Sequence, residues 1–150
     1  YGLIRQESRF VTTARSSAGA GGLMQLMPST ARWVAKRLGL KGHHSALVNE
    51  VDTNLSLGTY YLRQMLDSLN NQQVLASAGY NAGPKRAAQW RGLQPLEGAI
   101  YAETIPFPET RDYVKKVMSN TMYYARLFRH TSLSLRDRLG TVPPRATQNN

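Results

Sequence analysis

The stretch VLASAGYNAGPKRAAQW, residues 74–90, shows how this chain is built. Residues 74–80 have the small-residue pattern of a buried helix, and the Asn-Ala-Gly-Pro run that follows is a typical helix stop. A second helix, KRAAQW, is predicted to restart after Pro84. The stretch therefore predicts two short helices joined by a turn.

Residues that begin or end helices also occur before and after this stretch. Pro28 is expected to open the helix STARWVAKRL, which Gly39 closes, and Pro108 to open ETRDYVKKVMSNTMYYARLF. Asp52 is expected to cap a longer helix that ends near the Asn-Asn pair at 70–71. Because no alternating apolar pattern exceeds three or four residues, no strand is predicted. The sequence predicts an all-α domain of many short helices packed around one core.

Length and composition are consistent with one globular domain. The chain has 150 residues, 41% of them hydrophobic, and no apolar run approaches the ~20 residues that a membrane span needs. It has no cysteine, which excludes disulfides and thiolate metal sites. Helical periodicity fades beyond about Thr131, so we expect a domain at 1–130 and a C-terminal extension at 131–150 that is partly disordered, ending in a mobile tail, TVPPRATQNN. Tyr1 begins inside an apparent helix, which suggests a piece of a longer chain.

The charge balance predicts an anionic partner. Nineteen Lys and Arg against nine Asp and Glu give a net charge of +10. Nucleic acid, an acidic surface and a carboxylate-bearing polymer would all fit this charge. The basic residues are scattered and form no tract, which favours the acidic polymer over nucleic acid.

Glu7 lies where an apolar residue is expected. In YGLIRQESRF, Glu7 shares a helical stripe with Leu3 and Ile4, and Phe10 and Val11 are expected to extend that stripe. Burial of an unpaired carboxylate raises its pKa, which suits a general acid. The alternative is that Glu7 lies at the border of the stripe, with its head in water or paired with a neighbouring arginine. Position alone leaves both interpretations open.

Three later segments carry further candidate site residues. GAGGLMQLMP (19–28) allows close approach of a backbone and offers the amide of Gln25, although core filling and a plain turn explain it equally well. AGYNAGP (78–84) offers a sugar-stacking ring and an amide, or simply a helix stop. ETIPFPETRDYV (103–114) places Glu109 in the first turn of a helix and Tyr113 one turn later, where a structural role also suffices.

Other chemistries lack their sequence signals. His43 and His44 are adjacent, His130 is far away, and no His or carboxylate spacing resembles a metal site. No serine lies in a nucleophile elbow, and the GAGG run lacks the context of a phosphate loop. We therefore expect no metal and no cofactor.

Taken in order, QES (6–8), GLMQLMP (22–28), AGYNAGP (78–84) and ETIPFPETRDYV (103–114) resemble the catalytic domain of the soluble lytic transglycosylases. The resemblance covers roughly residues 1–130. It implies a lysozyme-like, mainly helical fold that cleaves bacterial peptidoglycan between N-acetylmuramic acid (MurNAc) and N-acetylglucosamine (GlcNAc). It also implies that one glutamate acts as acid and then as base, so that the product is 1,6-anhydroMurNAc.

The resemblance assigns roles residue by residue. Glu7 matches the catalytic glutamate. Seven further positions match substrate-binding residues of the family. Ser16, Gln25 and Met27 match residues of the groove, and Tyr80 and Asn81 match residues beside the scissile bond. Glu109 matches a sugar-binding residue, and Tyr113 matches a residue close to the catalytic acid. One departure is Gly79, which stands where alanine is common and is expected to loosen the groove slightly.

The same resemblance implies the setting of the protein. Peptidoglycan strands are the expected partner, without nucleic acid or a membrane span, and the protein is expected to be a periplasmic monomer. Two alternatives stay open at this point: a goose-type-lysozyme-like hydrolase, and a non-catalytic glycan-binding module.

Overall fold

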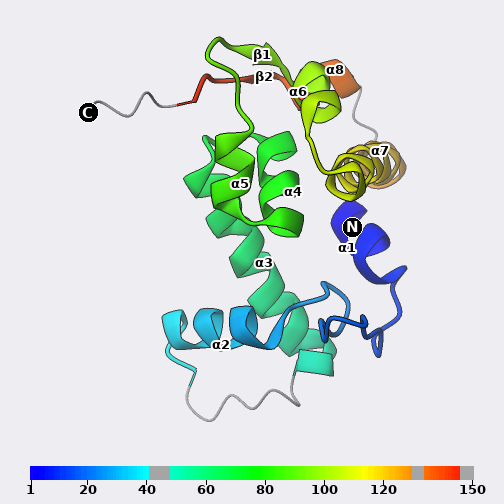
Figure 1. The fold of residues 1–150 in the computed structure, drawn as a ribbon. Coiled ribbons are helices and arrows are strands. Elements are labelled where there is room, and N and C mark those ends of the chain that lie inside the picture. Colours follow the sequence, from blue (N-terminus) through cyan, green and yellow to red (C-terminus); the bar gives the residue numbers. More distant parts are fainter. Residues whose placement is uncertain (41–47, 130–133, 146–150) are drawn as a thin grey trace, which may run out of the picture. The chain divides into compact units, whose positions relative to one another are not determined.

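The computed structural model describes residues 1–40, 48–129 and 134–145, which are mainly helical (Figure 1). The chain forms two compact units. Unit 1 consists of Tyr1 and residues 3–64, and unit 2 consists of Gly2 and residues 65–150. The helical content confirms the all-α prediction.

Unit 1 contains α1 (Gly2–Ser8) apart from Gly2, α2 (Pro28–Arg37) and most of α3 (Val51–Ser68). α2 begins at Pro28 and is followed by Gly39 in the left-handed region, with a φ of 68°, as the sequence predicts. α3 begins at Val51, two residues earlier than a cap at Asp52 implies, so Asp52 lies in its first turn instead of capping it. The Glu50 carbonyl accepts the Asn54 N–H at 2.8 Å at this end of the helix.

The chain between α1 and α2 is a compact, non-helical loop. Two isolated antiparallel bridges, Arg15 with Gly21 and Gly21 with Leu26, fold it back on itself. Gly22 has a φ of 76°, and a Cβ there would overlap the side chain of Asn54. The close backbone approach expected from the glycine run is therefore present, and its partner is a side chain of α3.

The core of unit 1 is small and mostly aliphatic. It is formed by the loop after α1, by one side of α2, by Val48 in the segment before α3 and by α3 itself. Its buried apolar residues include Leu23, Met24, Leu26, Ala31, Val34, Ala35, Val48 and Leu57.

Unit 2 contains the end of α3 and the remaining helices. These are α4 (Gln73–Ala82), α5 (Pro84–Gln89), α6 (Gly98–Thr104), α7 (Pro108–Arg129) and α8 (Leu135–Leu139). α4 packs against α5 and α7, while α6 packs against α7 and α8. Between α4 and α5, Gly83 adopts a φ of 92° and its N–H donates to the Gly79 carbonyl. The helix, stop and helix predicted for residues 74–90 are confirmed.

The C-terminal part of unit 2 differs from the sequence expectation. β2 (Thr141–Val142) pairs antiparallel with β1 (Leu96–Glu97), beside α6 and α8 in Figure 1. Leu139 and Val142 are buried, so the expected tail TVPPRATQNN begins with a packed and paired segment at Thr141–Val142, not with a mobile one. Two-residue strands show no periodicity, which is why the pattern search missed them. Residues 131–133 and 146–150 of the expected extension lie outside the described residues.

Gly79 serves packing inside unit 2. A Cβ at this position would lie 2.8 Å from Leu69 Cδ1 and 3.4 Å from Met65 Sδ. Leu69 is itself fully buried, so the missing side chain lets α4 approach the end of α3. The expectation that Gly79 slightly loosens the groove stays a prediction.

Membrane insertion has no candidate helix among residues 1–40, 48–129 and 134–145. None of the helices there is both long enough and apolar enough to cross a bilayer.

Candidate active site

Glu7 lies in the last turn of α1 and is half-buried. Leu3, one turn before it, is buried, and Ile4 is half-buried. This placement follows the stripe predicted from the sequence, because residues one turn apart share a face of the helix. The carboxylate is thus neither sealed in the core nor fully in solvent.

The stripe ends sooner than expected. Arg9 and Phe10 both adopt left-handed backbone conformations, with φ values of 52° and 67°, and terminate the helix. Ser8 stabilises this end, since its Oγ donates to the Ile4 carbonyl and accepts the Phe10 N–H, each at 3.2 Å. Phe10 and Val11 are exposed, so the expectation that they extend the apolar stripe is wrong.

Ser16 lies at the surface of the loop between α1 and α2. Its Oγ accepts the Ala20 N–H at 3.0 Å, and its own N–H donates to the Ala20 carbonyl at 2.9 Å. The side chain is held in one orientation by these bonds. Because a hydroxyl both accepts and donates, its proton is still available for a ligand.

Gln25 is fixed in the same loop with a φ of 46°. Its Nε2 donates to the Ala14 carbonyl at 3.0 Å and to the Gly22 carbonyl at 2.9 Å. Both partners are acceptors, which identifies the nitrogen of the amide and uses both of its hydrogens. The sequence suggested an amide offering donors and an acceptor; in the structure, the Oε1 acceptor is what Gln25 can offer to a ligand.

The two methionines of the loop have different environments. Met24 is 2% exposed and fills the core of unit 1, where Gly58 makes room for its side chain. Met27 is 39% exposed at the N-cap of α2. Met27 is therefore accessible to a ligand, whereas Met24 has the structural role that the sequence left open.

Asn54 on α3 is a residue that the sequence analysis missed. It is fully buried, and its Oδ1 accepts the Met24 N–H at 2.8 Å. Its Nδ2 donates to the carbonyls of Gly21 at 3.0 Å and Val48 at 2.7 Å. One side chain thereby fixes the backbone on both sides of Gly22, next to Gln25. The available signal was an asparagine one turn from the buried Leu57, with no hint of its distant partners.

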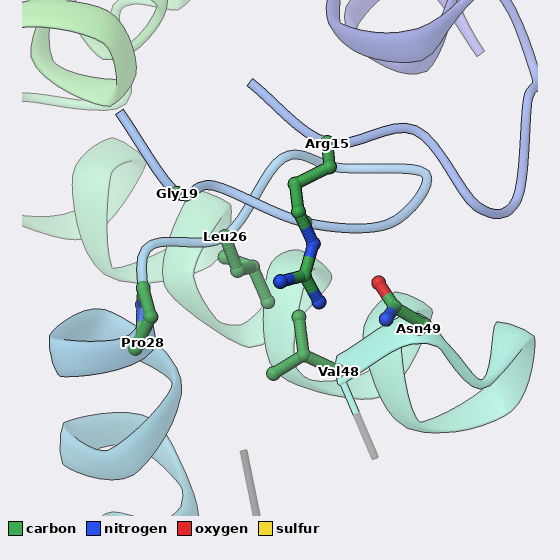
Figure 2. Close-up of a pocket in the computed structure, with 7 residues that line it drawn as sticks. Arg15, Gly19, Leu26, Pro28, Val48 and Asn49 are labelled. Atoms are coloured by element: carbon green, nitrogen blue, oxygen red, sulfur yellow. The ribbon is translucent and has the colours of Figure 1, made fainter. Parts of the chain in front are cut away.

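A cavity of about 330 Å³ opens beside this loop. Figure 2 shows the Arg15 side chain reaching from the loop toward Val48, with Leu26 on one side and Asn49 on the other. The Asn49 Oδ1 atom is buried and has no hydrogen-bond donor among the described residues. The cavity thus combines an apolar floor with a guanidinium group and an amide.

Tyr80 and Asn81 lie in the last turn of α4, directly before the Gly83 turn. Tyr80 is half-buried and Asn81 is exposed. The Asn81 Oδ1 accepts a hydrogen bond from the Thr110 hydroxyl of α7 at 2.7 Å. This bond orients the amide and leaves its Nδ2 as the group that can donate to a ligand. Thr110, which is 3% exposed, was also missed by the sequence analysis.

Glu109 and Tyr113 lie one turn apart on α7 but have different environments. Glu109 is exposed in the first turn, where the helix dipole favours a carboxylate. Tyr113 is 6% exposed. The start of α7 is held by Arg111, whose Nε donates to the buried Ile105 carbonyl at 3.0 Å. Glu109 is therefore the accessible member of the pair.

The structure thus groups the expected site residues by unit. In unit 1, Ser16, Gln25 and Met27 share the loop that Asn54 supports, and in unit 2 Asn81 is bonded to the helix that carries Glu109. Within residues 1–40, 48–129 and 134–145, no three His, Asp or Glu side chains gather as a metal site would require. The three histidines lie outside the described residues.

Comparison with protein families gives two matches along the chain. The family described as "Transglycosylase SLT domain" matches residues 1–100. The family described as "Soluble lytic transglycosylase helical domain" matches residues 104–133.

Three relatives illustrate the similarity. The soluble lytic murein transglycosylase of Escherichia coli K12 is 38% identical over 125 residues, covering 81% of this chain and 19% of that protein. An inactive glutamate-to-glutamine mutant of the lytic transglycosylase Slt from Pseudomonas aeruginosa matches with a TM-score of 0.84 and 39% identity, over 91% of this chain and 23% of the other. The 70 kDa soluble lytic transglycosylase in complex with bulgecin A matches with a TM-score of 0.78 and 35% identity, over 87% and 21%. The chain spans about a fifth of the length of these relatives.

Proposed function

The chain belongs to the transglycosylase SLT domain family, and from this premise we propose that it is a peptidoglycan lytic transglycosylase. It would cleave the β-1,4 bond between MurNAc and GlcNAc and release 1,6-anhydroMurNAc. The observation that carries the proposal is the match of the family over residues 1–100, which include Glu7, Gln25, Met27, Tyr80 and Asn81.

Glu7 is proposed as the single acid and base. Its carboxyl group donates a proton to the bridging oxygen as the bond from that oxygen to C1 of MurNAc breaks. The 2-acetamido carbonyl of the same sugar stabilises the positive charge that develops at C1. The Glu7 carboxylate then removes the proton of the 6-hydroxyl, whose oxygen bonds to C1 and closes the anhydro ring. No water is consumed, so a second carboxylate that activates water is not needed.

Two structural features support this role for Glu7. Its half-buried position, one turn from the buried Leu3, shields the carboxyl in part from water and still leaves it accessible to a ligand. The Pseudomonas aeruginosa relative is described as inactive when one glutamate is changed to glutamine. That description fits a mechanism that depends on one carboxyl group.

The remaining residues are proposed to position the glycan. The Oε1 of Gln25 would accept, and the Nδ2 of Asn81 would donate, because their other polar atoms already bond the protein. Tyr80 offers a ring that can stack on a sugar, while Ser16 and Met27 are accessible on the loop of unit 1. Glu109 is proposed as a sugar ligand and Tyr113 as a neighbour of the acid. Fixed positioning matters because ring closure is intramolecular, and well-oriented groups react as if at very high concentration.

The setting of the protein is part of the same proposal. We assign the catalytic domain to residues 1–130 and expect peptidoglycan strands as its partner. A substrate of the bacterial cell wall implies residence in the periplasm, and one chain is expected to act alone.

The deciding experiment is mass spectrometry of the products released from purified sacculi. Anhydro-muropeptides are expected. Reducing ends would instead identify a hydrolase of the goose-type-lysozyme kind, and binding without any release would identify a glycan-binding module. Each of these two results contradicts the proposal.

The first prediction concerns Glu7. Glu7→Gln keeps the size of the side chain but cannot donate the proton, so release of anhydro-muropeptides should fall at least about a hundredfold. Thermal unfolding and binding to sacculi should stay close to wild type. Glu50→Gln, at an exposed carboxylate of the same unit, is the matched control and should keep full activity. Undiminished turnover of Glu7→Gln would remove Glu7 from the mechanism.

A further inference from the structure

The exposed side of α2 carries a set of cations with no acidic neighbour on the helix. Arg32, Lys36 and Arg37 are exposed, and the helix sequence PSTARWVAKR contains no Asp or Glu. Residues four apart lie one above the other, so Arg32 and Lys36 form one row, and Trp33 and Arg37 form the next. The opposite side of α2 is buried in unit 1 by Ala31, Val34 and Ala35.

These cations are also unpaired within the described part of the chain. No ion pair there includes Arg32, Lys36 or Arg37. Three cations of unit 2, in contrast, are ion-paired: Lys115 with Glu103, Lys116 with Asp112, and Arg136 with Glu97. Three uncompensated charges on one short helix leave a local positive field available to an anionic partner.

Trp33 adds a flat ring to the same surface. It is 40% exposed, and the guanidinium carbon of Arg37 lies 5.0 Å from its ring centroid. On another side, the Tyr61 ring packs edge to face, with centroids 6.4 Å apart. These contacts hold the indole in place and keep the Arg37 charge at the surface. The helix therefore presents a preformed combination of positive charge and one aromatic ring.

We propose that this α2 face, formed by Arg32, Trp33, Lys36 and Arg37, is an anchoring surface that binds the stem-peptide carboxylates of peptidoglycan. The inference rests on the proposed function and extends it, because retaining the enzyme on the polymer is a separate task from cleaving it. Carboxylates repeat along such strands, so several cations on one helix can be engaged at once. Binding of this kind keeps the enzyme at the polymer between successive cleavages.

The chemistry of the α2 face favours the cell-wall polymer over a lipid surface. An amphipathic helix that binds a membrane must insert its apolar side. In α2 that side is already buried against its own unit, and Trp33 is the one aromatic residue on the exposed side. Nucleic acid would also respond to positive charge, so it is included as an arm of the test.

The experiment compares two triple variants of the full chain. Arg32→Gln/Lys36→Gln/Arg37→Gln removes the α2 cations, and Lys115→Gln/Lys116→Gln/Arg136→Gln removes three cations that are already ion-paired. The two variants lose the same net charge. Co-sedimentation with purified sacculi is measured over a salt series, and anhydro-product release is measured on sacculi and on short soluble strands.

The α2 variant should bind sacculi about tenfold more weakly at low salt, and the control should bind like wild type. Salt should narrow the difference, because it screens exposed charges. Blocking the sacculus carboxylates as amides should abolish the difference. Turnover of short strands should be unchanged in both variants, because these strands are too short to need anchoring. The proposed function is tested separately: it fails if the wild-type chain yields no anhydro products from the short strands.

Three results would overturn the inference. Equal loss of binding in both triple variants would show that only net charge matters. Unchanged binding of the α2 variant to native sacculi would show that the α2 face does not anchor the enzyme. Binding to phosphatidylglycerol vesicles or to duplex DNA is measured in the same way. If removal of the three α2 cations weakens that binding more than it weakens binding to sacculi, the surface is reassigned to a membrane or to nucleic acid.

Discussion

The hydrogen bond from Thr110 to Asn81 shows how one buried hydroxyl can set the chemistry of an exposed side chain. Thr110→Val keeps the shape of the side chain but removes the donor to Asn81 Oδ1. If Nδ2 of Asn81 positions the glycan, anhydro-product formation should fall about tenfold, the range expected for one lost hydrogen bond. Thr110→Ser retains a hydroxyl and should restore most of the activity.

A double-mutant cycle distinguishes this positioning role from a general loss of stability. Thr110→Val should have little further effect in an Asn81→Ala background, because the amide that it orients is then absent. Thermal unfolding measured in parallel reports the stability cost separately. If the two losses simply add, Thr110 has no positioning role. If Asn81→Ala itself leaves turnover unchanged, Asn81 does not belong to the site.

Asn54 provides a second prediction at this scale. Asn54→Leu would leave the buried Met24 N–H and the Val48 carbonyl without the hydrogen bonds that Asn54 makes to them. The Gly21 carbonyl would lose its bond to Asn54 but keep the one from the Leu26 N–H. Unsatisfied buried groups of this kind should lower the free energy of unfolding by about 2–4 kcal/mol. Urea denaturation measures the loss. Ser56→Leu, at an exposed position of the same helix, is the control and should change stability by less than about 0.5 kcal/mol.

If Asn54→Leu were as stable as wild type, the loop would be able to satisfy these groups in another way. The prediction also has a structural consequence for Gln25, which bonds the Gly22 carbonyl in the same loop. The Asn54 side chain leaves room only for a glycine at position 22. A bulkier leucine at position 54 should therefore displace the loop as well as remove its hydrogen bonds.

Among the elements, α8 is the one whose stability should depend most directly on acid pH. Ser134 and Asp137 form a capping box: the Ser134 Oγ accepts the Asp137 N–H at 3.1 Å, and the Asp137 carboxylate accepts from the Ser134 hydroxyl and backbone N–H. These bonds lower the pKa of Asp137 below its usual value of 3.8. A lowered pKa in the folded state means that the ionised form is stabilised by folding.

The pH dependence follows from that sign. The capping contribution should be complete above the unfolded pKa near 3.8 and should be lost as pH falls through the lower folded value. Asp137→Asn should therefore reduce hydrogen-exchange protection of the Gly140 N–H, which bonds the Arg136 carbonyl, near neutral pH. At pH values below the folded pKa, the variant and wild type should exchange alike. Equal protection at neutral pH would contradict the role of the cap.

Helices that begin at a proline could be predicted from the sequence, whereas the paired strands could not. Pro28, Pro84 and Pro108 open helices because proline suits the first helical position, and this preference is local. The β1–β2 pair joins residues more than forty positions apart through two residues on each side, so no local pattern encodes it. The predicted start of α3 was two residues too late, because Asp is favourable both as a cap and in the first turn.

The candidate site was predictable to a similar extent. Residue types and motif order identified candidates such as Glu7 and Asn81, because chemistry-bearing side chains follow from the motifs. What each atom can offer was not predictable. Gln25 uses its amide hydrogens within its own loop, and Asn81 uses its oxygen on Thr110. These assignments depend on partners that lie 3, 11 and 29 residues away, which only the folded backbone brings into contact.

The packed part of unit 2 continues beyond residue 130, the expected end of the catalytic domain. The sequence places a boundary near residue 130, whereas Leu139 and Val142 are buried and β2 pairs with β1 in unit 2. Gly98, at the start of α6, also donates its N–H to the Gly140 carbonyl at 2.7 Å, and a Cβ there would overlap the Leu139 backbone. The segment 134–145 is therefore part of the packing of unit 2.

A chain truncated after Arg129 tests which boundary is physically meaningful. Each fully buried Leu or Val contributes roughly 1.5–3 kcal/mol, and ordering the segment offsets part of this, so truncation should lower the free energy of unfolding by about 2–4 kcal/mol. Urea denaturation gives the value, and Leu139→Ala in the intact chain should reproduce part of it. Leu135→Ala, at an exposed position of α8, should not. An unchanged unfolding midpoint after truncation would instead support the boundary at residue 130, and would mean that α8 and β2 rest on unit 2 without stabilising it.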